Sequence, residues 1–61
     1  MEGVPVREQL MAAARERKSV TFYDAVNQED QIRAAAFDIR KRFNVQVEII
    51  RQGRNIVVTF K

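Results

Sequence analysis

The sequence predicts an α+β fold in which two helices pack on one face of a three-stranded sheet, in the order helix, strand, helix, strand, strand. Two segments repeat their apolar residues with the helical period, and three shorter segments alternate apolar and polar residues. The last two of these short segments flank a glycine-containing turn, which is typical of a hairpin. Two helices on one sheet face would bury both sets of apolar side chains.

The first predicted helix covers about Pro5 to Arg17. Pro5 suits the first helical turn, because the amide hydrogen that proline lacks would be unpaired there. Basic residues in the last turn suit the negative end of the helix dipole. One stripe of the helical wheel holds Val6, Leu10, Ala13 and Arg17, with Ala14 beside it.

The second predicted helix runs from about Gln28 to Phe43. Asn27 is a suitable N-cap, and Asp30 three residues later resembles the acidic partner of a capping box. Asn44 is suited to end the helix, because asparagine tolerates the left-handed conformation. The core stripe of this helix holds Ile32, Ala35, Ala36, Ile39 and Phe43.

Three strands are predicted, at Val20 to Tyr23, Val45 to Arg51 and Asn55 to Lys61. Gly53-Arg54 fits the two-residue type II′ turn of a C-terminal hairpin. The hairpin register that this turn sets pairs Ile49 with Val58 and Val47 with Phe60 facing the helices, and Ile50 with Val57 and Glu48 with Thr59 on the outer face. Shifting the register by one residue would scatter the apolar side chains, so the pattern selects this pairing.

Composition limits the chemistry that the chain can perform. Its 61 residues suit one small domain, residues 1–61, and it contains neither cysteine nor histidine. Ser19, the only serine, therefore has no histidine to activate it. Asp24, Glu29 and Asp30 could form a weak site for a hard cation, but acids at a helix start more often stabilise the helix dipole. We expect no catalytic residue, no metal, no cofactor and no enzymatic activity.

The sequence also indicates where the protein works. No apolar run approaches the roughly 20 residues that cross a bilayer, and residues 1–5 lack the apolar core of a signal peptide. The absence of cysteine suits a reducing compartment. We therefore expect a cytoplasmic protein that does not bind membranes. A formal net charge of +3 permits an anionic partner without requiring one.

Phe37 is the most informative residue of the second helix. It lies about 140° from Ile32 on the helical wheel, off the core stripe, taking 100° per residue. An outward aromatic ring among basic side chains can stack a base while its neighbours hold phosphates. The platform would consist of Arg33, Phe37, Arg40 and Lys41, with Arg51, Arg54 and Lys61 as secondary phosphate contacts. In the alternative interpretation, Phe37 packs against the first helix or a loop, and the basic residues compensate the helix dipole.

The outer face of the sheet is a second candidate surface. Tyr23, Ile50 and Val57 are predicted to point there among polar residues such as Thr21 and Thr59. An exposed mixed patch of this kind can mark a protein interface. The alternative is the ordinary solvated face of an antiparallel sheet.

The chain resembles the family of small single-stranded nucleic-acid-binding domains named for an Arg-x-x-x-His motif. Arg33-Ala34-Ala35-Ala36-Phe37 occupies the motif position, with Phe37 in place of the histidine. Asn44-Val45 stands where the family has a Gly-Leu-like break, and residues 55–61 resemble its last strand. The resemblance implies a phosphate-binding role for Arg33. The same layout resembles the C-terminal domain of bacterial translation initiation factor three, which binds ribosomal RNA.

Two functions follow as hypotheses. The first is a non-catalytic module that binds single-stranded DNA or RNA without strong sequence preference. The second is a small protein-interaction module or inhibitor, monomeric or homodimeric, that binds a protein partner through the outer sheet face or an edge strand.

Overall fold

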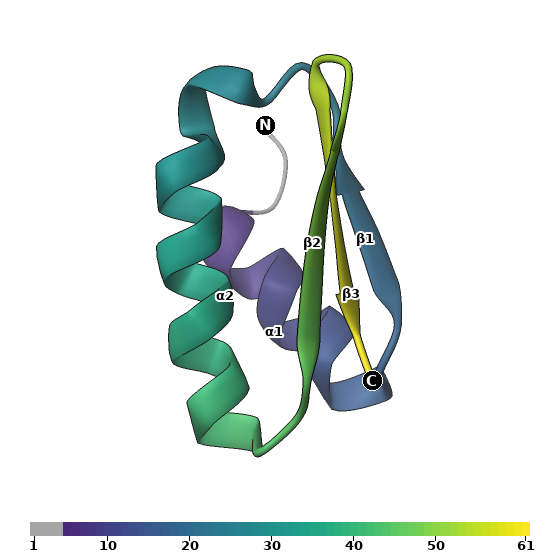
Figure 1. Cartoon of the computed structure of the whole chain (residues 1–61). Helices are drawn as coiled ribbons and strands as arrows, with labels where there is room; N and C mark the ends of the chain where they lie inside the picture. Colours follow the sequence, from purple (N-terminus) through teal and green to yellow (C-terminus); the bar gives the residue numbers. More distant parts are fainter. Residues whose placement is uncertain (1–4) are drawn as a thin grey trace.

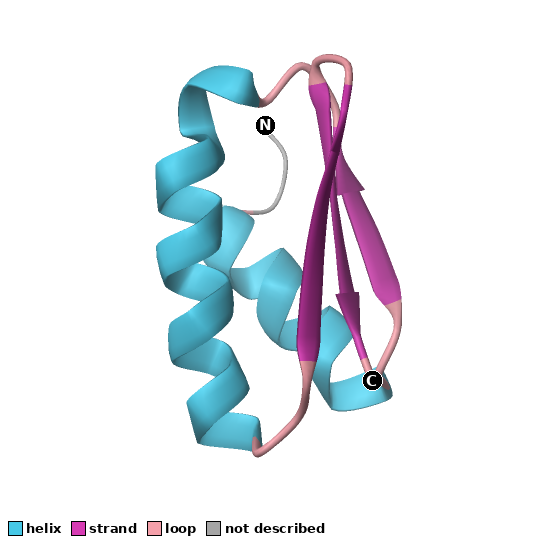
Figure 2. Cartoon of the chain, viewed as in Figure 1, coloured by secondary structure: helices cyan, strands magenta, loops and turns pink. Residues whose placement is uncertain are grey.

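The computed structural model describes residues 5–61 and confirms the predicted α+β fold (Figure 1). The strands form an antiparallel sheet in the order β1-β3-β2, and both helices lie on the same side of it (Figure 2). The prediction that no signal peptide is present falls almost entirely on residues 1–4, outside the described residues. The elements are α1 (Val6–Glu16), β1 (Ser19–Phe22), the 3₁₀ turn η1 (Val26–Gln28), α2 (Glu29–Phe43), β2 (Val47–Gln52) and β3 (Asn55–Phe60).

The core lies between the two helices and the inner face of the sheet. Central strand β3 contributes every second residue to this core, as the predicted alternation requires. The largest fully buried side chains are Leu10 of α1, Ile32 and Ile39 of α2, and Ile56, Val58 and Phe60 of β3. Because β3 contacts both helices, it joins the two halves of the domain.

The hairpin has the predicted register. Val47 pairs with Phe60, Ile49 with Val58 and Ile50 with Val57. Gly53 has a φ of 61°, and of the two turn residues it alone has a positive φ, as a type II′ turn requires.

The predicted N-cap of α2 is wrong. Asn27 lies inside η1, and Gln28 precedes α2 without a side-chain capping hydrogen bond. The chain instead enters α2 through two hydrogen bonds from its backbone amides to the hairpin. The amide of Asp24 donates to Oδ1 of Asn55 at 3.0 Å, and the amide of Ala25 donates to the Arg54 carbonyl at 2.8 Å.

Two further residues lie beyond the elements in which they were predicted. Arg17 is not part of the apolar stripe of α1; it is exposed and ends the helix with a left-handed φ of 55°. Tyr23 does not extend β1, because the chain turns at Asp24, which has a φ of 52°. Asn44 ends α2 with a left-handed φ of 54°, as predicted.

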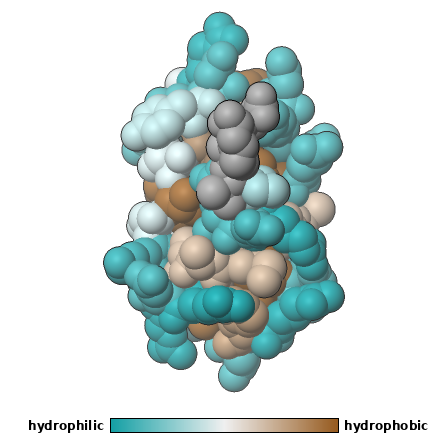
Figure 3. Space-filling view, turned by 180° about the vertical axis from the view of Figure 1, so that it is seen from behind, coloured by the Kyte–Doolittle hydropathy of each residue, from teal (hydrophilic) through white to brown (hydrophobic). Residues whose placement is uncertain are grey.

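The exposed apolar surface is dispersed. Seen from behind, patches of apolar surface alternate with hydrophilic groups (Figure 3). The exposed large apolar side chains of the described residues are Tyr23, Val26, Phe37 and Ile50. No helix within residues 5–61 is long and apolar enough to cross a membrane.

Candidate functional site

The flank of α2 that faces β2 carries three of the predicted platform residues. Arg33, Phe37 and Arg40 fall within about 60° of one another on the helical wheel, taking 100° per residue. Lys41 lies further toward solvent on the same helix. The core stripe of Ile32, Ala36 and Ile39 fixes the rotation of α2. This flank lies beside edge strand β2, because Phe37 and Arg40 line a groove with Val47 and Glu29 contacts Arg51.

Phe37 and Arg40 line a shallow, open groove together with Gln46 and Val47 at the start of β2. We call this feature the α2–β2 groove; its volume is about 300 Å³. The Phe37 residue is 45% exposed, so the ring is neither buried nor fully solvated. An aromatic face of this kind is available for stacking by a flat ligand.

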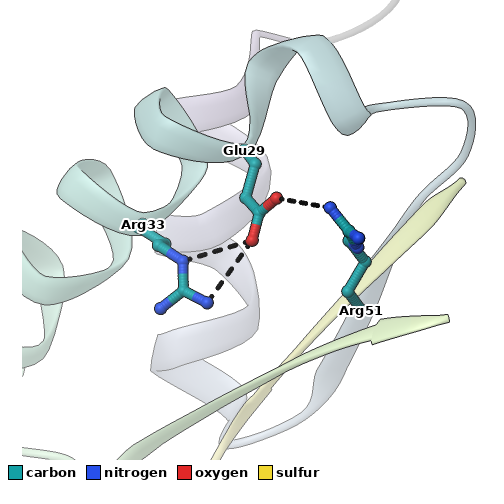
Figure 4. A network of polar contacts seen from close by, with 3 residues as sticks. All are labelled: Glu29, Arg33 and Arg51. Carbon is teal, nitrogen blue, oxygen red and sulfur yellow. Dashed lines mark hydrogen bonds and ion pairs between the residues drawn. The ribbon is translucent and has the colours of Figure 1, made fainter.

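The carboxylate of Glu29 connects the first turn of α2 to β2. Arg33 donates from Nε and Nη2 to Oε2 of Glu29, each at 3.4 Å, and Arg51 donates from Nη1 to Oε1 of the same residue at 3.3 Å (Figure 4). The Glu29 side chain is 22% exposed, the lowest exposure among the carboxylates that form ion pairs in residues 5–61. The predicted residues Arg33 and Arg51 are thus brought together through Glu29, an acid that the sequence had assigned to the helix dipole or to a weak cation site.

Arg40 and Lys41 have no carboxylate partner among residues 5–61. With Arg33 and Arg51 they give this side of the molecule four cations, against the acids Glu29 and Asp30 in the first turn of α2. The α2–β2 side of the molecule therefore carries more basic than acidic side chains.

The charged groups of Arg54 and Lys61 pair with acids outside this groove, although the backbone of Lys61 pairs with that of Gln46, which lines the groove. Arg54 occupies the hairpin turn and donates from Nε to Oδ1 of Asp24 at 2.8 Å. Lys61 follows β3, and its Nζ lies 3.4 Å from Oε1 of Glu48, which alternates onto the outer face of the sheet. The structure therefore does not group these two cations with Arg33, Phe37 and Arg40.

Two arginines at the end of α1 also lack a carboxylate partner in the described part of the chain. Arg15 and Arg17 end α1 and line an open pocket of about 420 Å³ with Phe43 and Val45 at the end of α2. No local sequence signal indicated this proximity, because it depends on how the two helix ends meet.

The outer sheet face retains two of its three predicted apolar residues. Ile50 and Val57 are cross-strand neighbours there, and Ile50 is 42% exposed. Beside them Ser19 Oγ and Thr59 Oγ1 lie 2.8 Å apart in a hydrogen bond. Tyr23 lies past the end of β1, where it lines a shallow pocket with residues of α1.

No cluster of three or more acidic residues that could hold a metal ion occurs within residues 5–61. The groove offers the Phe37 ring and the Arg40 guanidinium, and the same side of the molecule adds Lys41 and the carboxylate of Glu29 that Arg33 and Arg51 share. Such a set of groups can bind an anion that carries flat rings.

Comparisons with protein-family models, with curated proteins and with solved structures found no match for this chain. The resemblance to the Arg-x-x-x-His domains therefore stays a prediction that rests on Arg33 and the order of elements.

Proposed function

We propose that this chain is a non-catalytic module that binds single-stranded nucleic acid along the α2–β2 groove. The observation that carries the proposal is the half-exposed ring of Phe37 beside Arg40, a cation without an ion-pair partner in residues 5–61. Stacking on an aromatic side chain contributes about 1–3 kcal/mol per base and is available to every base.

Phosphate binding would come from the cations around the ring. Arg40 and Lys41 lie one turn after Phe37, and Arg33 lies one turn before it. A strand that stacks a base on Phe37 would bring its neighbouring phosphates to these side chains. Because such contacts depend on phosphate charge and on the faces of the bases, we expect binding to show little sequence preference and strong salt dependence.

A single-stranded ligand fits this surface better than a duplex. The groove is shallow, and its ring is available only to a base that is not already stacked within a helix. We propose a cytoplasmic location, because single-stranded RNA is accessible there and a chain without cysteine suits a reducing compartment.

Fluorescence anisotropy with labelled 20-nucleotide DNA and RNA tests the proposal at low salt and at near-physiological salt. We expect micromolar or tighter binding that weakens steeply as salt rises. No binding at low salt would overturn it.

A matched pair of charge reversals locates the site. Arg40 and Arg15 are both exposed, both lie in the last turn of a helix, and neither has an ion-pair partner in the described residues. Arg40→Glu should weaken binding by more than tenfold, whereas Arg15→Glu should change it only through the net charge. Equal losses would place binding outside the α2–β2 groove.

A protein-interaction module is the second candidate, favoured by the exposed pair of Ile50 and Val57 on the outer face. No other element of residues 5–61 covers this face (Figure 1). Light scattering after size exclusion would test the homodimeric form. A dimer that Ile50→Lys converts to monomer would support this candidate, and a concentration-independent monomer would exclude self-association.

A further inference from the structure

Glu29 occupies the place between two guanidinium groups that come from different elements. Arg33 belongs to α2 and Arg51 to β2, and each contacts a different oxygen of the carboxylate (Figure 4). The two arginine side chains remain 48% and 56% exposed, so solvent reaches both of them. A second anion can therefore approach the same two groups.

The contacts to Glu29 are long. Hydrogen bonds between guanidinium and carboxylate groups typically measure about 2.7–2.9 Å. The three contacts here measure 3.3–3.4 Å, as do the ion pairs Arg42–Asp38 and Lys61–Glu48 at 3.4 Å, whereas Arg7 and Asp38 approach to 2.6 Å and Arg54 and Asp24 to 2.8 Å. Each arginine therefore keeps much of its capacity to bind a stronger acceptor.

A phosphate group is such an acceptor. It carries more oxygen atoms than a carboxylate, and arginine donates to either group through the same planar fork. We infer that Arg33 and Arg51 form a binding site for a backbone phosphate, an inference that rests on the proposed function. In the free protein, the Glu29 carboxylate occupies this site and competes with the phosphate. Nucleic acid binds there by displacing the Glu29 carboxylate.

The position of this site suits a strand that runs along α2. Arg33 precedes Phe37 by four residues, about one helical turn. A base on the Phe37 ring would then have one flanking phosphate at Arg40 and the other at the pair of arginines. The Glu29 carboxylate therefore lowers the affinity only for the phosphate at Arg33 and Arg51.

Removal of the competing charge should strengthen binding, and a matched variant controls for net charge. Glu29→Gln and Asp30→Asn each remove one negative charge from the first turn of α2. Asp30 is exposed and forms no ion pair within residues 5–61. Anisotropy with single-stranded DNA at near-physiological salt should give about tenfold tighter binding for Glu29→Gln and less than about threefold tighter binding for Asp30→Asn. The slope of the logarithm of the binding constant against the logarithm of salt concentration should also steepen for Glu29→Gln, by about 0.7 for each added phosphate contact.

A double variant shows whether the gain depends on the proposed site. Glu29→Gln combined with Arg51→Gln should return the affinity to about that of the wild type. Urea unfolding of each variant establishes that it is folded at the assay temperature.

The outcomes separate this inference from the proposed function. If the wild type binds but Glu29→Gln binds no tighter than Asp30→Asn, Glu29 merely holds the arginines in place and the inference is overturned. A gain that persists without Arg51 also overturns it. If neither the wild type nor Glu29→Gln binds at low salt, the proposed function fails and the phosphate site fails with it.

Discussion

Nη2 of Arg7 on α1 donates a hydrogen bond of 2.6 Å to Oδ2 of Asp38 on α2. Nε of Arg42 lies 3.4 Å from the same oxygen. This contact lies on the flank of α2 opposite to Glu29, which contacts Arg51 of β2. Each flank of α2 therefore joins a neighbouring element through one acid. The flank that holds Asp38 is fixed to the other helix, and the flank beside β2 lies at the open edge of the sheet.

Protonation of Asp38 should lower the stability of the fold in acid. The hydrogen bond from Arg7 holds the pKa of Asp38 below its ordinary value of 3.8 in the folded chain, and the charge of Arg42 acts in the same direction. The folded chain thus binds fewer protons than the unfolded chain, so this stabilisation is complete above pH 4–5 and is lost as the pH falls through the folded pKa. Asp38→Asn should be less stable at pH 7 and should lose less stability between pH 5 and pH 2, as measured by urea unfolding.

Asp30→Asn is the control for this pH experiment, because Asp30 is an exposed acid without an ion pair in the described residues. Part of the acid response should remain in both variants. The hydrogen bond from Lys18 lowers the pKa of Glu16, which adds to the response with the same sign. If Asp38→Asn and the wild type lost equal stability in acid, the Arg7 contact would not persist in solution.

Replacement of Phe37 should separate binding from folding. The residue is 45% exposed, so about half of its surface is buried, and Phe37→Ala should lower the free energy of unfolding by about 1–2 kcal/mol while the chain stays folded at the assay temperature. The loss of a stacking partner should weaken the affinity for single-stranded DNA by about tenfold to a hundredfold. Anisotropy and urea unfolding on the same preparation measure the two effects.

Tyr23→Ala is the matched control for Phe37→Ala. Tyr23 is 77% exposed and lies beyond β1, away from the α2–β2 groove. Its loss should change neither the affinity nor the urea midpoint by much. Weakening of similar size in both variants would argue against stacking on Phe37.

The fold could be predicted because its pattern is redundant. Alternation in the hairpin and the turn at Gly53 specify the same register, and that register places Arg51 on the inner side with Val47 and Ile49. Residue spacing likewise placed Arg33, Phe37 and Arg40 on one flank of α2. The meeting of Glu29 and Arg51 was not predictable, because it depends on how far α2 is shifted along β2, which no local pattern specifies.

Predictions failed where tertiary contacts decide the conformation of a few residues. Asn27 is of a residue type that often caps helices, but the hydrogen bonds from Asp24 and Ala25 to the hairpin set the path into α2. The same turn removes Tyr23 from the outer face. Long cationic side chains are harder still to place, because Arg54 finds its acid partner outside its own hairpin.

Arg17 should be a position where glycine increases stability. α1 ends in a Schellman arrangement, in which the amides of Arg17 and Lys18 donate to the carbonyls of Ala14 and Ala13 at 3.2 and 2.9 Å. This arrangement requires the left-handed φ of 55° at Arg17, which is strained for a residue with a Cβ atom. Arg17→Gly should therefore raise the free energy of unfolding by about 0.5–1 kcal/mol.

Asn44→Gly provides the comparison, because Asn44 has nearly the same φ of 54° but tolerates it better than arginine does. Its gain should be only a few tenths of a kcal/mol. Urea unfolding of both variants at pH 7 measures the difference. An increase in the free energy of unfolding for Asn44→Gly as large as that for Arg17→Gly would show that the strain does not depend on residue type here. A decrease for Arg17→Gly would show that the Arg17 side chain stabilises the end of α1 by more than the strain costs.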